Sequence, residues 1–162
     1  MTLVVPFDGS DLSKAALVRA AQFQEVLDED VLVVSAIPRG NETYARNKGW
    51  LGSKESFDAE VIVERLRTPV ADLHADAEFH HIFVDRYAPR GEVANALRKF
   101  AREHDASIVF VGSENAGRIV TGLTVGRSVA ADTSYDTMLI SAVRPSKATK
   151  LEDVRPTPDP RE

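Results

Sequence analysis

The residues from Gly126 to Val129 combine a glycine, a cation, a hydroxyl and two backbone amides at a predicted helix start. Glycine lets the backbone turn sharply, and the first N–H groups of a helix bind anions such as phosphate. Arg127 adds a positive charge, and Ser128 either contacts the anion or caps the helix. A solvent-exposed loop with a capped helix has the same pattern, so these four residues alone favour neither interpretation.

Asp8 is the second residue suited to ligand chemistry. It follows the apolar run 3–6, which predicts a short strand buried on both faces. In open parallel sheets the ligand crevice lies beyond the carboxyl ends of the strands, so Asp8 is expected on the floor of such a crevice. Its carboxylate can accept hydrogen bonds from a sugar hydroxyl or a base amine. Asp8 or Ser10 is equally suited to cap the following helix, and the two roles are compatible.

The segment 112–126 is rich in Gly, Ser, Thr and Asn and follows another predicted strand. Gly112 and Gly117 have the spacing of the phosphate-binding loop G-x-x-x-x-G-K-[ST]. Arg118 stands where that loop has its lysine, and Ile119 stands where it has the hydroxyl that binds magnesium, so we reject this interpretation. Neither G-x-G-x-x-G nor G-x-S-x-G occurs, which excludes a dinucleotide-binding loop and a hydrolase nucleophile elbow.

Composition excludes several classes of function. The absence of cysteine removes disulfides, thiol catalysis and cysteine-ligated metals, and the four histidines form no metal-binding pattern. A net charge of −5 without a lysine or arginine cluster argues against nucleic-acid binding. No apolar run approaches the roughly twenty residues of a membrane span, and the N-terminus lacks the features of a signal peptide. We therefore expect a cytoplasmic protein without nucleic-acid or membrane partners, catalytic residues or a metal site.

Short apolar runs alternate with stretches of helical periodicity along the chain, which predicts an α/β fold. We expect a single doubly wound, five-stranded parallel sheet with helices on both faces. A long loop or lid is expected over 38–54, and the composition of residues 144–162 predicts a disordered tail after a folded domain of residues 1–143. The predicted strands span 3–5, 31–37, 81–84, 107–111 and 137–142, and the predicted helices span 12–27, 55–77 and 91–104.

Three segments resemble universal stress proteins. The opening run LVVPFDGS at 3–10 is similar to the start of these proteins, as is GEVA at 91–94, which begins a helix ahead of the fourth strand. The most specific segment is IVFVGS at 108–113, followed by the glycine-rich loop, GRSVA at 126–130 and a final strand. The resemblance covers residues 1–143 and implies a universal stress protein-like α/β domain, related to Rossmann and adenine nucleotide alpha hydrolase-like folds, that forms homodimers.

This family divides into ATP binders and non-binders, and the resemblance implies a site for this chain. Binders use an aspartate after the first strand, backbone at the end of the second strand, and a loop of the form G-x₂-G-x₉-G-[ST]. Asp8 matches the aspartate, and Ala36 falls near the second-strand position. Gly112 matches the first glycine of the loop and Gly126 the last.

The loop departs from the family pattern at two places. Asn115 stands where the pattern has its middle glycine, and Arg127 is inserted before Ser128. Asparagine tolerates left-handed backbone better than other non-glycine residues, and Gly117 can take over part of the role. The resemblance therefore implies weakened or altered binding of ATP or AMP, with Mg²⁺ accompanying the nucleotide. The implied nucleotide-binding residues are Pro6, Asp8, Ala36, Gly112, Ser113, Asn115, Gly117, Gly126, Arg127, Ser128 and Val129.

Three functions are compatible with these features. The first is a stress-response regulator of the universal stress type that binds ATP or another adenine nucleotide between the loops after the first and fourth strands. The second is a nucleotide-free dimeric interaction module. The third, a slow ATP hydrolase, is least favoured because only Glu114 and Asp8 are candidate catalytic groups near the loop.

The last predicted strand, from Thr137 to Ala142, carries three large apolar residues and no charge. At the edge of a sheet such a strand would present unpaired backbone groups, which favours pairing with another chain. We therefore expect a homodimer formed through this strand, as the family resemblance also implies. A C-terminal tail folded back over the strand is the alternative.

Overall fold

Five strands and four helices make up the part of the chain that the computed structural model describes, namely residues 1–112, residue 129 and residues 133–142. Strands and helices alternate along most of this part, but two helices separate the second and third strands. The strands are β1 (Thr2–Pro6), β2 (Asp30–Pro38), β3 (Glu78–Val84), β4 (Ala106–Gly112) and β5 (Asp136–Ile140). The helices are α1 (Asp11–Leu27), α2 (Glu42–Asn47), α3 (Ala59–Leu73) and α4 (Arg90–Glu103).

The sheet has the strand order β3-β2-β1-β4-β5, and every neighbouring pair is parallel. β1 lies at its centre, where Leu3 is opposite Val31 of β2 and Ile108 of β4. The chain builds outward from β1 to β3 on one side and then crosses to β4 on the other side. The predicted doubly wound parallel sheet is therefore confirmed, and the winding reverses between β1 and β4.

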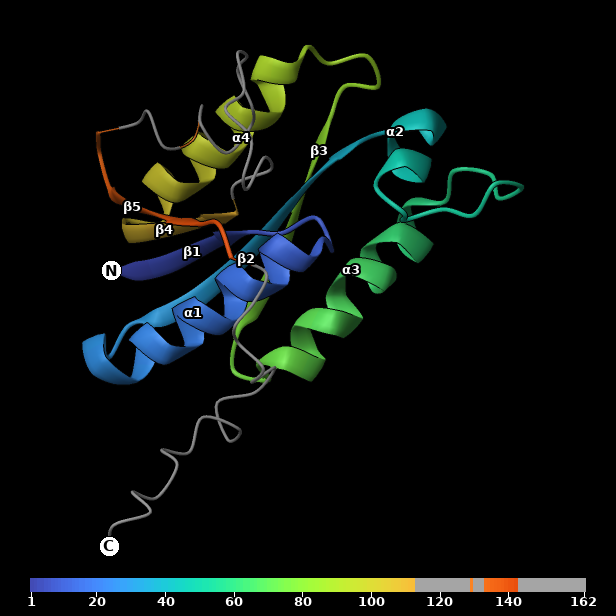
Figure 1. Cartoon of the computed structure of the whole chain (residues 1–162). Helices are drawn as coiled ribbons and strands as arrows, with labels where there is room; N and C mark the ends of the chain where they lie inside the picture. The colour runs from blue at the N-terminus through green and yellow to red at the C-terminus, as the bar shows by residue number, and fades with distance from the viewer. Residues whose placement is uncertain (113–128, 130–132, 143–162) are drawn as a thin grey trace, which may run out of the picture.

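Helices cover both faces of the sheet (Figure 1). On one face, Leu17 of α1 and Ile62 of α3 belong to the same buried cluster as Leu3. On the other face, Leu97 of α4 belongs to the cluster that contains Val4. Neighbouring residues of β1 join different clusters because side chains alternate between the two faces of a strand. This burial on both sides explains why the strand is a continuous apolar run.

The structure differs from the sequence-based expectation mainly between β2 and α3. The predicted loop over 38–54 contains the helix α2, whose N-cap Asn41 accepts a hydrogen bond from the backbone N–H of Tyr44 at 3.0 Å. Helix α3 begins later than predicted, after its cap Asp58, and β3 begins earlier than predicted. The predicted tail at 144–162 lies outside the described residues. Within the described ranges, no helix is long and apolar enough to cross a membrane.

Candidate functional site

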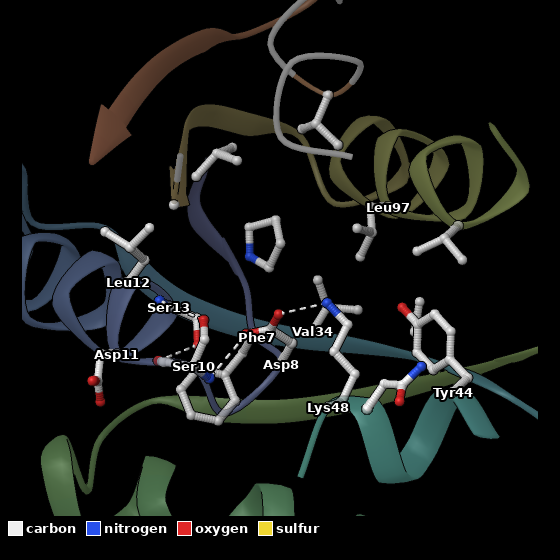
Figure 2. A pocket seen from close by; sticks show the side chains of 17 residues that line it. Phe7, Asp8, Ser10, Asp11, Leu12, Ser13, Val34, Tyr44, Lys48 and Leu97 are labelled. Carbon is white, nitrogen blue, oxygen red and sulfur yellow. Dashed lines mark hydrogen bonds and ion pairs between the residues drawn. The ribbon is translucent and has the colours of Figure 1, made fainter. Parts of the chain in front are cut away.

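A pocket of about 430 Å³ opens at the carboxyl ends of β1, β2 and β4. Its volume is in the range of small-molecule sites, about 300–1,000 Å³. It lies where the winding of the sheet reverses, which is the place where ligands bind in open α/β sheets. Figure 2 shows side chains from β2, α1, α2 and α4, and from the turn after β1, converging on it. This location makes the pocket the candidate functional site.

An apolar surface forms one part of the pocket wall. Val34 and Ala36 come from β2, Val111 comes from β4, and Val93 and Leu97 come from α4. All five belong to the hydrophobic cluster between the sheet and α4, so their positions are fixed by packing. A wall of this kind suits the flat, apolar faces of an aromatic ring.

Asp8 supplies a negative charge at the floor of the pocket. It is placed there by the turn after β1, in which Gly9 adopts a φ of 81° that favours glycine. One carboxylate oxygen, Oδ1, accepts a hydrogen bond from the backbone N–H of Ser10 at 2.9 Å. The other oxygen, Oδ2, lies 2.9 Å from Nζ of Lys48. The backbone carbonyl of Asp8 accepts a hydrogen bond from Nε1 of Trp50 at 2.7 Å.

The environment of Asp8 keeps its carboxyl ionised. Burial acts to raise the pKa, but the positive charge of Lys48 and the hydrogen bonds from Ser10 and Lys48 outweigh it, so the pKa is lowered from its ordinary value. The group therefore carries a negative charge at neutral pH and acts only as a hydrogen-bond acceptor.

The first turn of α1 forms another part of the wall. Ser10 caps this helix, because its side chain accepts a hydrogen bond from the backbone N–H of Ser13 at 3.2 Å. In return, Oγ of Ser13 donates to the carbonyl of Ser10 at 2.9 Å. The capping role that the sequence offered for Ser10 is therefore present, and Asp8 remains available to face the pocket.

Gly112 ends β4 against the first turn of α1. A Cβ atom at this position would lie 2.9 Å from Cβ of Leu12 and 3.2 Å from its carbonyl carbon. Both atoms are held by the backbone of α1, so a side chain at 112 would push the helix away from the strand. Gly112 and Leu12 both line the pocket. The close packing of β4 against α1 therefore favours glycine at position 112 independently of any ligand.

Helix α2 supplies three lining residues that the sequence analysis did not select, namely Tyr44, Asn47 and Lys48 just after it. The helix is held by its cap Asn41, whose Nδ2 donates to the carbonyl of Arg86 at 2.8 Å. Two local signals for this helix are present in the sequence: asparagine at the cap, and an ion pair four residues apart between Glu42 and Arg46.

The pocket brings together five of the residues that the sequence analysis selected. Pro6, Asp8, Ala36, Gly112 and Val129 all line it, although they come from segments far apart in the chain. The other selected residues lie outside the described part of the chain; they are Ser113, Asn115, Gly117, Gly126, Arg127 and Ser128. Among the described residues, no group of three His, Asp or Glu side chains is placed to hold a metal ion.

The family of the chain follows from comparison with protein-family models. The model of the universal stress protein family matches residues 1–133. The chain therefore belongs to the universal stress protein family, as the sequence resemblance indicated. A comparison with curated proteins finds no match.

Solved structures with the same fold are also universal stress proteins. One, a universal stress protein in complex with cAMP, has a TM-score of 0.58 and 24% identity, over 88% of this chain and 98% of the other. A universal stress protein from Archaeoglobus fulgidus has a TM-score of 0.57 and 20% identity, over 86% of this chain and 98% of the other. The structure of the universal stress protein from Archaeoglobus fulgidus in complex with dAMP has a TM-score of 0.53 and 21% identity, over 86% of this chain and 97% of the other. These similarities establish the fold.

Proposed function

We propose that this universal stress protein is a stress-response regulator that binds an adenine nucleotide in the pocket at the ends of β1 and β4. The observation that carries the proposal is the convergence of Asp8, Ala36, Gly112 and Val129 on one pocket. The complexes of two structurally similar proteins with cAMP and dAMP support an adenine nucleotide as the class of ligand.

The composition of the pocket wall suggests how such a ligand would lie. The apolar side chains of β2 and α4 offer a surface for the adenine ring, and Asp8 offers an acceptor for a hydroxyl or amino group of the nucleoside. The phosphates would then extend toward Gly112 at the end of β4, where the backbone has no side chain in the way. ATP or AMP fits this arrangement, with Mg²⁺ as the counterion of the phosphates.

Replacing Asp8 with asparagine is expected to weaken AMP and ATP binding by roughly tenfold or more, since the side chain loses the negative charge that strengthens its hydrogen bond to the ligand. Isothermal titration calorimetry of the purified protein measures the effect. Asp72→Asn is the matched control, because Asp72 is exposed on α3, away from the pocket. Equal affinities of wild type and Asp8→Asn would contradict the role of Asp8, and no heat with either nucleotide would contradict the proposed function.

Two further measurements separate this function from its alternatives. A nucleotide that copurifies with the protein, detected by ultraviolet absorbance after denaturation, would speak against a nucleotide-free interaction module. Phosphate release under saturating ATP would support the slow hydrolase instead.

We also propose that the protein is a homodimer joined through β5. β5 is the edge strand beyond β4, and within the described residues no strand pairs with its outer side. Leu139 of β5 is 53% exposed, which is unusual for a large apolar residue in a sheet. Pairing with the same strand of a second copy would cover both the backbone groups and this side chain.

The dimer proposal predicts that Leu139→Lys weakens self-association by roughly tenfold or more, because a charge would be buried at the interface without a partner. Sedimentation velocity over a range of protein concentrations measures the shift from dimer to monomer. Val26→Lys is the control, since Val26 is also exposed but lies on α1. A wild-type protein that sediments as a monomer at all concentrations would refute the dimer.

A further inference from the structure

The ion pair between Asp8 and Lys48 lies in the wall of the pocket and joins two segments that are far apart in the sequence. Nζ of Lys48 is 2.9 Å from Oδ2 of Asp8, and each side chain is 29% exposed. Both residues line the pocket, and Figure 2 shows them side by side next to Tyr44. The pocket therefore presents a hydrogen-bond donor and a hydrogen-bond acceptor at adjacent points.

The ion pair is part of the pocket wall and does not fill the pocket. The volume of about 430 Å³ is present with the pair formed, so a ligand can enter without breaking it. The carboxylate of Asp8 accepts hydrogen bonds from the backbone N–H of Ser10 at Oδ1 and from Lys48 at Oδ2, and a further one from the side chain of Ser10. A carboxylate has about four lone-pair sites, so one remains for a donor on the ligand.

Lys48 is held at the pocket by the folded segment that follows α2. Its backbone N–H donates to the carbonyl of Tyr44 at 3.0 Å, and its Nζ lies 5.7 Å from the centre of the Tyr44 ring. Two residues further on, Nε1 of Trp50 donates a hydrogen bond to the Asp8 carbonyl. Of the described residues that line the pocket, Lys48 is the only basic one. Its position is thus set by the fold and is not that of a lysine extended into solvent.

We propose that Asp8 and Lys48 together recognise two neighbouring groups of the ligand: Asp8 accepts a hydrogen bond from one, and Lys48 donates a hydrogen bond to the other. This makes Lys48 a specificity-determining residue. This inference rests on the proposed nucleotide binding. A nucleoside offers the required chemistry at two places: the amino group of adenine beside a ring nitrogen, and the two adjacent hydroxyls of ribose. A site that pairs with both members of such a set rejects analogues that lack one, because a polar group of the protein is left unpaired.

The test measures specificity and not affinity alone. Isothermal titration gives Kd for AMP, for 2′-deoxy-AMP, which lacks one ribose hydroxyl, and for purine riboside monophosphate, which lacks the amino group. For wild type we expect AMP to bind roughly tenfold or more tightly than one of the two analogues. That analogue identifies the part of the nucleoside that the pair reads. In Lys48→Met we expect weaker binding of AMP and a preference over that analogue reduced to near onefold.

Two variants control the interpretation. Lys54→Met removes an exposed lysine from the same segment, outside the pocket, and should keep both the affinity and the preference of wild type. Lys48→Arg keeps the charge beside Asp8 and should retain part of the preference. Circular dichroism on heating checks that each variant is folded.

The outcomes separate this inference from the proposed function. If wild type binds AMP and Lys48→Met keeps the wild-type preference over both analogues, the recognition role of Lys48 is wrong while nucleotide binding stands. The same conclusion follows if Lys48→Met binds AMP more tightly, because Lys48 would then obstruct the site. If wild type binds none of the three ligands, the proposed function fails and this inference fails with it.

Discussion

Replacing Trp50 with alanine is expected to lower the free energy of unfolding by about 3–5 kcal/mol, the usual cost of removing a large buried aromatic side chain. Trp50 is only 4% exposed and belongs to the hydrophobic cluster between the sheet and α1 and α3. Its ring packs against Tyr44 with ring centres 5.6 Å apart, and its Nε1 donates to the Asp8 carbonyl at 2.7 Å. The substitution therefore leaves a cavity and removes the link between the α2 segment and the floor of the pocket.

Urea denaturation followed by circular dichroism measures this loss, since Trp50 is the only tryptophan and the variant has no indole fluorescence. Trp50→Phe is the matched variant, because it keeps an aromatic ring and removes the N–H that bonds to Asp8. It should cost about 1–3 kcal/mol, because a partly buried acceptor loses its hydrogen bond and the smaller ring fills less of the core. If Trp50→Ala is as stable as wild type, the segment after α2 is not part of the folded core.

The fold was predictable because its signals are local. β1, β2 and β4 are continuous apolar runs, and α1 and α4 have apolar residues at helical spacing, so their types follow from short stretches of sequence. The alternation of these elements then favours a parallel sheet, and the reversal between β1 and β4 places the ends of these two strands side by side. Asp8 and Gly112 could be expected at the same edge of the sheet because both stand at the carboxyl ends of predicted parallel strands, whereas the order of the strands came from the structure.

The contribution of α2 could not be read in the same way. The helix has six residues, of which only Ala45 is buried, so it has almost no apolar periodicity. Its place in the site depends on the contact between Lys48, which follows the helix, and Asp8. These two residues are 40 positions apart in the chain, and no local pattern predicts such a pairing. The asparagine cap and the Glu42–Arg46 pair indicate a helix, but they say nothing of what the helix faces.

Gly112 shows a different limit of reasoning from sequence. The family resemblance implies a role for this residue in nucleotide binding, whereas the structure gives it a role in the close approach of β4 and α1. A glycine in a binding pattern can thus be required by packing, by a ligand or by both. The short spacing to Leu12 reveals the packing reason, and a substitution at this position tests packing and ligand binding at once.

Replacing Gly112 with alanine is therefore expected to lower the free energy of unfolding by about 1–3 kcal/mol, as is usual for overpacking. The added Cβ would meet Cβ of Leu12 at 2.9 Å and its carbonyl carbon at 3.2 Å, so β4 and the start of α1 must move apart. Because both residues line the pocket, the same movement should weaken nucleotide binding. Urea denaturation and calorimetric titration measure the two effects.

Gly91→Ala is the control for the general effect of adding a methyl group to a glycine. A Cβ at this position meets nothing within 4 Å, and Gly91 lies in α4, where alanine is the better helix former. Its expected effect is a gain in stability of up to about 1 kcal/mol, opposite in sign to that of Gly112→Ala. If both variants were as stable as wild type but only Gly112→Ala bound nucleotide weakly, the glycine would serve the ligand and the close approach to Leu12 would be of no energetic consequence.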